Sequence, residues 1–206
     1  MTAQTRSQTS REPNTEEVLR RIARIMSLGD DLPPAGTAVG DLTREFLRNN
    51  WQSYCEAFGD RNSRARVFPE PRETPRTFQF EIDLPYKSKR NRDAPVELEP
   101  GPIRGMVIYR PDMFSNLDEP CVAVRLDPAM AYFHPNYSRQ HGLVCLGPIN
   151  QFKGPILLDV LVENHLYPIL SYQNRRPHHP ADFEAARYFA MNPDAMDGLV
   201  PVPPLY

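Results

Sequence analysis

The segment from His134 to Cys145 (HPNYSRQHGLVC) brings together residue types that can do acyl chemistry. Cys145 supplies a thiol, whose thiolate is a strong nucleophile toward a carbonyl carbon. Asn136 supplies an amide donor, the kind of group that stabilises the oxyanion formed when a carbonyl is attacked. Pro135 has a fixed φ and stiffens the chain next to Asn136. The segment therefore predicts a loop that holds a cysteine nucleophile near a braced carboxamide.

This segment resembles the active-site loop of ubiquitin-conjugating enzymes. The family motif is His-Pro-Asn, later Gly, any residue, an aliphatic residue, the catalytic Cys and Leu, and here it reads His134, Pro135, Asn136, Gly142, Leu143, Val144, Cys145 and Leu146. An aromatic residue and a proline then precede a helix in the family, where this chain has Phe152 and Pro155. The resemblance covers roughly residues 76–190. Two departures are that Phe152 replaces the usual Trp and that the Asn-to-Cys spacing is one position longer than usual.

The resemblance implies an activity. Cys145 would carry a ubiquitin-like modifier as a thioester and transfer it to a lysine amine. The implied partners are the modifier, an ATP-dependent activating enzyme and a lysine-bearing protein acceptor. Asn136 would either donate to the oxyanion or brace the loop. An imidazole near the amine would take its proton, because histidine titrates near neutrality.

The remaining site residues follow from the same resemblance. His179 is the first candidate for the proton acceptor and His178 the second, because they stand where the family often has an acidic residue. His134 is expected to hold the loop through hydrogen bonds, with Pro135 beside it. Tyr172, near the end of an expected helix, is a candidate to line the cleft.

Two other readings stay open. A non-catalytic module of the same fold would only bind a ubiquitin-like protein, but such members typically lack the cysteine found here at position 145. A cysteine thioesterase or protease needs a histidine base against the thiol. His134 is the candidate for that base, although nothing in the sequence places its ring at Cys145. The other cysteines, Cys55 on a helix stripe and Cys121 at the start of a strand, are expected in the core.

Composition limits the other functions. The 206 residues include 24 Lys+Arg and 26 Asp+Glu, and a net charge of −2 gives no general field for nucleic acid or an anionic membrane, so neither is expected as a partner. No apolar run could span a bilayer and no secretory signal is visible, so we expect a cytoplasmic protein with reduced thiols. Without a Gly-rich phosphate loop, a Cys-x-x-Cys or a His-Glu-x-x-His motif, we expect no cofactor and no metal. The nine Lys and Arg between Arg61 and Arg92 indicate a solvated loop or, alternatively, a basic docking surface.

The elements that must position the loop can be read from hydrophobic periodicity. Helices are expected from about Asn14 to Gly29, from Asp41 to Gly59, over 156–170 with a bend or stop near Pro168, and from about 180 to 190. Strands are expected over 77–84, 105–110 and 121–126, with loops over 61–76, 85–102 and 127–155.

This order predicts an α+β fold: an antiparallel meander sheet, like that of ubiquitin-conjugating enzymes, flanked by N-terminal and C-terminal helices. The high proline content, 23 residues, excludes a helix bundle. We expect a disordered tail over 1–13, an N-terminal helix and linker over 14–40, the catalytic domain over 41–195 and an extended C-terminal tail over 196–206.

Overall fold

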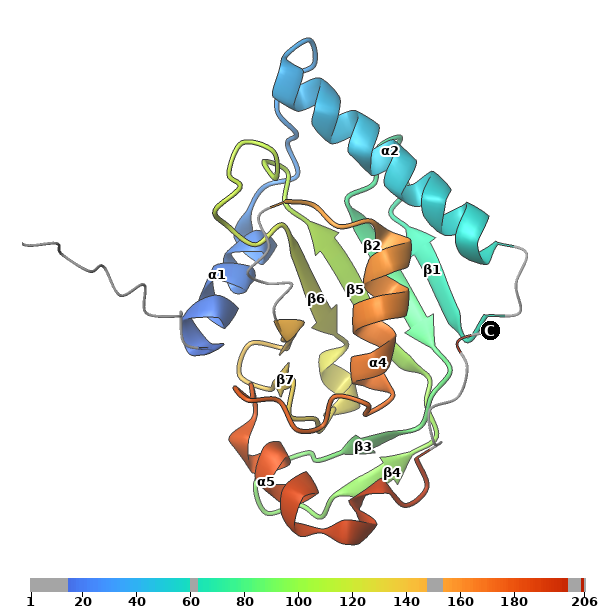
Figure 1. The fold of residues 1–206 in the computed structure, drawn as a ribbon, viewed down its shortest axis with the longest axis vertical. Coiled ribbons are helices and arrows are strands. Elements are labelled where there is room, and N and C mark those ends of the chain that lie inside the picture. The colour runs from blue at the N-terminus through green and yellow to red at the C-terminus, as the bar shows by residue number, and fades with distance from the viewer. Residues whose placement is uncertain (1–14, 60–62, 148–153, 200–204, 206) are drawn as a thin grey trace, which may run out of the picture.

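A six-stranded sheet is the centre of the molecule (Figure 1). The structure, a computed structural model, describes residues 15–59, 63–147, 154–199 and 205. The strands lie in the order β1-β2-β5-β6-β8-β7, and each neighbouring pair is antiparallel. Their bounds are β1 (Ala65–Pro69), β2 (Thr77–Ile82), β5 (Ile103–Tyr109), β6 (Val122–Leu126), β7 (Tyr137–Ser138) and β8 (Leu143–Val144). The predicted α+β class is confirmed.

Alternation of side chains gives the sheet two different faces. In β2, Phe78, Phe80 and Ile82 are buried while Gln79 points to the other side. This period of two is the pattern of a strand with one face against the core. The buried side chains join the main core beneath α2 (Ala38–Phe58) and the helical segment that ends in α4 (Tyr167–Leu170). Figure 1 shows both helices on the near side of the sheet.

Helix α2 begins three residues before the expected start. Thr37 caps it, because its Oγ1 accepts a hydrogen bond from the N–H of Gly40 at 3.1 Å. The buried stripe is also narrower than predicted. Leu42 and Cys55 are exposed, so the prediction that Cys55 belongs to the core is wrong. The reason is that the sheet contacts only one side of a long helix, and both residues lie outside that side.

The helix predicted over 156–170 forms in three consecutive pieces. These are α3 (Leu158–Leu161), the π-helical turn η3 (Val162–Leu166) and α4. Pro168 lies inside α4, so the helix continues past the expected stop. Proline cannot donate the usual helical hydrogen bond, and the wider π turn lies directly before the piece that contains it.

Three expected loops contain short strands. Within 61–76 the chain forms β1, which pairs with β2. Within 85–102 it forms a separate two-stranded sheet of β3 (Tyr86–Ser88) and β4 (Glu97–Glu99). Within 127–155 lie the 3₁₀ turn η1 (Pro128–Met130) and the β7–β8 hairpin. β3, β4, β7 and β8 have only two or three residues, too few alternations for a reliable period, which is why the sequence did not reveal them.

Helix α1 (Thr15–Ser27) covers part of the opposite face of the sheet. Its buried side chains, among them Leu19 and Ile22, pack against Ile108 of β5, Ala123 of β6 and Leu143 of β8. These three strand residues alternate with core residues, so they belong to the outer face. α1 lies beside β6 in Figure 1. The expected cap at Asn14 lies outside the described residues.

The C-terminal region begins with α5 (Phe183–Met191), followed by the 3₁₀ turn η4 (Pro193–Met196). α5 begins later than predicted because Asp182, not Pro180, starts it: Asp182 Oδ1 accepts from the N–H of Ala185 at 3.0 Å. Near the C-terminus, Leu205 is buried, and its carbonyl accepts from the N–H of Arg64 at 2.8 Å.

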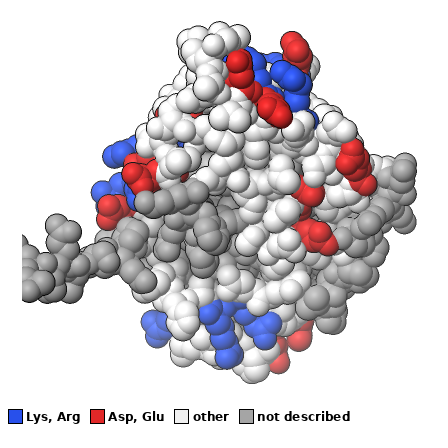
Figure 2. Space-filling view, turned by 45° about the horizontal axis from the view of Figure 1, so that its top comes forward, with Lys and Arg blue, Asp and Glu red and all other residues white. Residues whose placement is uncertain are grey.

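The face of the molecule drawn in Figure 2 shows no dominant sign of charge. On the face drawn in Figure 2, acidic and basic side chains form small groups at the margins of a largely uncharged middle. Within the described ranges, no helix is both long and apolar enough to cross a membrane. The tail predicted over 1–13 lies outside those ranges.

Candidate functional site

Cys145 and Asn136 lie opposite each other at the open end of the β7–β8 hairpin. The hairpin pairs Tyr137 with Val144 and Ser138 with Leu143. The backbone N–H of Cys145 then donates to the carbonyl of Asn136 at 2.6 Å, which continues this pairing by one step. The predicted approach of the two residues is therefore a consequence of strand register and not of a flexible loop.

The turn of this hairpin closes tightly. Gly142 adopts φ 68°, a left-handed conformation that favours glycine, and its N–H donates to the carbonyl of Ser138 at 2.7 Å. The turn residues 139–142 thus account for much of the nine-position separation of Asn136 and Cys145.

The hairpin gives Cys145 an intermediate environment. Tyr137 and Val144 point into the main core, whereas Leu143 points to the α1 side. Alternation places Cys145 on the same side as Leu143, and Cys145 indeed packs at the edge of the α1 cluster. Its side chain is half-buried, while Asn136 is only 3% exposed. The thiol thus lies at the surface end of the hairpin, with α1 as one neighbour.

His134 supports the loop from inside the protein. It is fully buried, and its Nδ1 accepts the backbone N–H of Asn136 at 3.0 Å. Burial lowers the pKa of His134 to about 3, so the ring is neutral at neutral pH. The proton therefore lies on Nε2, for which the described residues provide no hydrogen-bond partner. The ring packs against that of Tyr172 in an edge-type arrangement, with 4.7 Å between ring centroids and 64° between the ring planes.

Tyr172 lies in the interior and not along an open cleft, contrary to the expectation for it. It is 1% exposed and has a positive φ of 61°. Its hydroxyl accepts the N–H of Lys87 at 2.9 Å and lies 3.2 Å from the carbonyl of Phe133. Tyr172 therefore ties the residue before His134 to the small β3–β4 sheet.

The segment containing His178 and His179 lies against the same loop. The carbonyl of Pro135 accepts the N–H groups of Ala181 and Asp182 at 2.7 and 3.1 Å. Both histidines are exposed, and the carbonyl of His179 accepts from Thr15 Oγ1 at 3.3 Å. Their imidazoles are thus available to solvent at the rim of the loop.

Sequence reasoning missed the ion pairs that fix this segment. Arg139, in the hairpin turn, pairs through Nε with Asp182 and through Nη2 with Glu184, both at 2.6 Å. Lys89 also pairs with Glu184 at 2.6 Å, and together these cations hold down the pKa of that carboxyl. The sequence signal for Asp182 was available, since Asp before Phe-Glu-Ala-Ala is typical of a helix N-cap. No such signal linked it to Arg139.

Two further residues, Cys121 and His141, form no ion pair with Asp182 or Glu184. Cys121 is buried, as expected, with Sγ 3.0 Å from the carbonyl of Gly154, and burial raises the pKa of its thiol. His141 of the hairpin turn has Nε2 3.3 Å from Glu16 of α1. Across the described residues, no three His, Cys, Asp or Glu side chains gather in a way that would hold a metal ion.

Comparison with known proteins adds no relative to these observations. The chain matches no model of a protein family, and no curated protein is similar to it.

Proposed function

We propose that this chain is a conjugating enzyme for a ubiquitin-like modifier and that its α+β fold is a divergent form of the fold of ubiquitin-conjugating enzymes. The observation on which the proposal depends is the hydrogen bond from the Cys145 N–H to the Asn136 carbonyl. It sets a half-buried thiol opposite a residue with an amide side chain, at the end of a hairpin stiffened by His134. The sheet order and the helix after the hairpin agree with the proposed fold.

In the first step, the Cys145 thiolate attacks the carbonyl carbon of a thioester held by an ATP-dependent activating enzyme. A new C–S bond to Cys145 forms and the old C–S bond breaks. The activating enzyme leaves as a thiolate, and the energy of the thioester is retained. A half-buried thiol suits this step, because both reacting groups belong to macromolecules that meet at the surface.

In the second step, the lysine amine of a protein acceptor attacks the Cys145 thioester. A C–N bond forms, the C–S bond breaks and Cys145 leaves as a thiolate. The amine loses one proton, which His179 at the rim of the loop accepts, with His178 as the second candidate. Asn136 either donates to the oxyanion of this step or holds the loop in place.

The main alternative enzyme class, a cysteine hydrolase with His134 as its base, receives less support. The Nδ1 atom of His134 is occupied by the N–H of Asn136. With a pKa of about 3, the ring is too weakly basic to take a thiol proton near neutrality. A non-catalytic module that binds a ubiquitin-like protein stays as the second alternative.

The test is to incubate the protein with ATP, an activating enzyme and the modifier from its own cell extract, and to analyse it by intact mass. We expect an adduct that thiol reagents release and that Cys145→Ala abolishes. Cys55→Ala is the matched control, because Cys55 is also an accessible thiol. An adduct that persists in Cys145→Ala contradicts the proposal. Binding of the modifier without any adduct supports the non-catalytic module instead.

A further inference from the structure

A basic groove lies beside the hairpin turn, and the proposed reaction does not use it. The groove has a volume of about 370 Å³ and runs between the hairpin turn, the end of β6 and the residues after β3. Its described lining includes Lys89, Arg90, Arg125, Arg139 and His141, and it contains no Asp or Glu. The other described lining residues are uncharged, so every side chain of the lining that carries a formal charge is basic.

Two of these cations are already neutralised. Lys89 and Arg139 pair with Glu184, and Arg139 also pairs with Asp182. These ion pairs hold one wall of the groove in a fixed shape, because Asp182 is itself buried. Arg139 still has donors to spare, since a guanidinium has five N–H groups.

The other two arginines have no carboxylate partner. Among the described residues, neither Arg90 nor Arg125 forms an ion pair or a side-chain hydrogen bond. Arg90 is exposed and Arg125 half-buried. The acidic residue nearest to Arg125 in sequence, Asp127, accepts the N–H of Ala129 at 2.9 Å and forms no ion pair with Arg125 among the described residues. The described lining of the groove thus leaves the guanidinium groups of Arg90 and Arg125 without a paired carboxylate.

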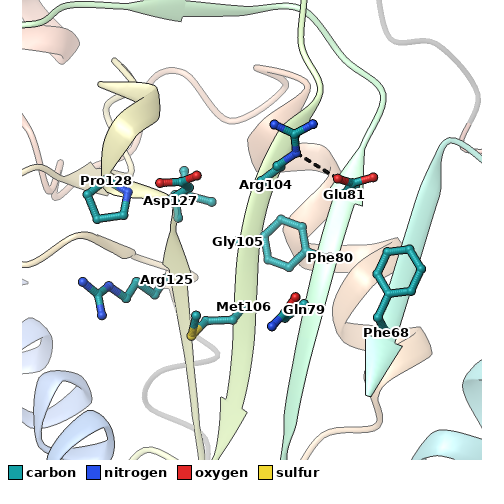
Figure 3. A pocket seen from close by; sticks show the side chains of 11 residues that line it. Phe68, Gln79, Phe80, Glu81, Arg104, Gly105, Met106, Arg125, Asp127 and Pro128 are labelled. Carbon is teal, nitrogen blue, oxygen red and sulfur yellow. Dashed lines mark hydrogen bonds and ion pairs between the residues drawn. The ribbon is translucent and has the colours of Figure 1, made fainter. Parts of the chain in front are cut away.

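Arg125 reaches the groove from the outer face of the sheet. Figure 3 shows its side chain extending from β6 to the side away from Met106 and from the Arg104–Glu81 ion pair. A Cβ atom added at Gly142 would lie 3.8 Å from Arg125 Nε, so this guanidinium arm passes directly beside the hairpin turn.

We propose that this groove binds an acidic segment of the protein acceptor, so that carboxylates of the acceptor pair with Arg90 and Arg125. The identity of the partner as the protein acceptor rests on the proposed function, whereas the binding of carboxylates by the groove does not. Carboxylates are the natural partners of a guanidinium, which can hold them by two parallel hydrogen bonds.

The position of the groove fits this role. Cys145 follows Gly142 by three residues of extended chain, a distance of roughly 10 Å. A lysine a few residues away from the bound carboxylates can therefore reach the thiol. The groove would then select acceptors in which acidic residues lie close to the modified lysine.

The charge pattern favours an acidic protein segment over a nucleic acid. Nucleic acids bind along a series of phosphate contacts and need an extended stripe of cations. Here the unpaired cations are few, and the neighbouring Lys89 and Arg139 are already paired with Glu184 and Asp182.

The binding test uses the full chain and a fluorescent peptide with one lysine followed by four glutamates, at low salt. We expect saturable binding that weakens as salt is raised, and no comparable binding of the peptide with glutamines in place of glutamates.

The double variant Arg90→Ala/Arg125→Ala should weaken binding about tenfold or more. The control is Arg48→Ala, which removes an exposed arginine of α2 far from the groove and should leave binding unchanged. Arg90→Ala alone, on an exposed loop, should weaken binding about threefold and covers the case in which the double variant does not fold.

The results separate this inference from the proposed function. Cys145→Ala should retain full peptide binding while losing the modifier adduct, so a chain that binds the peptide but forms no adduct overturns only the conjugating activity. Equal binding of the glutamine peptide, or wild-type binding by the arginine variants, overturns the proposal that the groove binds an acidic segment. A single-stranded oligonucleotide that binds more tightly than the peptide, through the same arginines, overturns the acidic-protein assignment.

Discussion

The Nδ1 atom of His134 accepts a hydrogen bond from the backbone N–H of Asn136, two residues further along the chain, at 3.0 Å. This bond needs an unprotonated Nδ1, and a fully buried ring has no solvent to stabilise a charge. The loop that holds Asn136 therefore depends on a neutral histidine, and this dependence has a measurable consequence.

Stability should fall as the pH is lowered below about 6.5. The pKa of His134 is about 3 in the folded chain and 6.5 for an ordinary histidine, so between these values only the unfolded chain binds the proton. The contribution of neutral His134 to the free energy of unfolding is present in full above pH 6.5. It is lost as the pH falls toward 3, at up to about 1.4 kcal/mol per pH unit. Urea unfolding at several pH values measures this slope. His134→Asn should reduce the slope of the free energy of unfolding against pH by an amount that corresponds to nearly one bound proton. His178→Ala changes an exposed residue and should leave the slope as it is. Equal slopes in all three proteins would exclude His134 as the cause.

Loss of α1 packing should make Cys145 more reactive. Ile22 is fully buried between α1 and the outer face of the sheet, in the cluster that Cys145 also touches. Ile22→Ala should cost about 2–4 kcal/mol and loosen α1, so that iodoacetamide modifies Cys145 several-fold faster in the folded protein. Peptide mapping by mass spectrometry gives the rate at each cysteine.

The matched control for this experiment is Ile82→Ala, which removes an equally buried side chain from the main core. It should lower the free energy of unfolding by a similar amount but leave the native-state rate at Cys145 unchanged. If both variants alter that rate equally, α1 has no particular role in covering the thiol.

The ion pair between Asp182 and Arg139 should couple the last helix to the hairpin. Asp182→Ala removes both the cap of α5 and the 2.6 Å contact to Arg139, with an expected cost of about 1–3 kcal/mol. Asp182→Asn keeps a capping oxygen and should cost less. A double-mutant cycle with Arg139→Ala isolates the pair, and a coupling free energy near zero would show that the two side chains act independently.

Asn136 should matter more for transfer to lysine than for loading of Cys145, because only the attack by the amine depends on the complete loop around the thioester. Asn136→Ala should keep thioester formation within about threefold and slow aminolysis about 100-fold or more. The two rates are measured separately by quench-flow or gel assays, beside a thermal melt of each protein. Equal loss in both rates, with an unfolded hairpin by circular dichroism, would assign Asn136 a purely structural role.

His179 should influence only the second step, because it lies at the rim of the loop and has an exposed side chain. His179→Ala should slow aminolysis most near neutral pH, where an imidazole accepts protons efficiently, and the difference should shrink at alkaline pH, where the amine is already deprotonated. His178→Ala is the neighbouring control and should have the smaller effect. A pH–rate profile that His179→Ala leaves unchanged removes this residue from the mechanism.

The sequence alone determined the parts of the fold that have a strong local pattern. The alternation of Phe78, Phe80 and Ile82 specified β2 and its buried face, and the three–four spacing of Val18, Ile22 and Ile25 specified α1. These patterns can be read because the side-chain period of each element is set by its own backbone. His134, Asn136 and Cys145 also lie within one short segment of the sequence, so the sequence alone could group them as one candidate site.

The tertiary structure decided which of these residues meet and how exposed each one is. The pairing of Asn136 with Cys145 depends on the hairpin register, and β7 and β8 have only two residues each, too few to show a period. The contact between Arg139 and Asp182 joins residues 43 positions apart, and the burial of Tyr172 behind His134 depends on packing against the β3–β4 sheet. Cys55 is exposed because the sheet touches only one side of α2. Such long-range contacts follow from how complete elements pack together, and no local pattern in the chain records them.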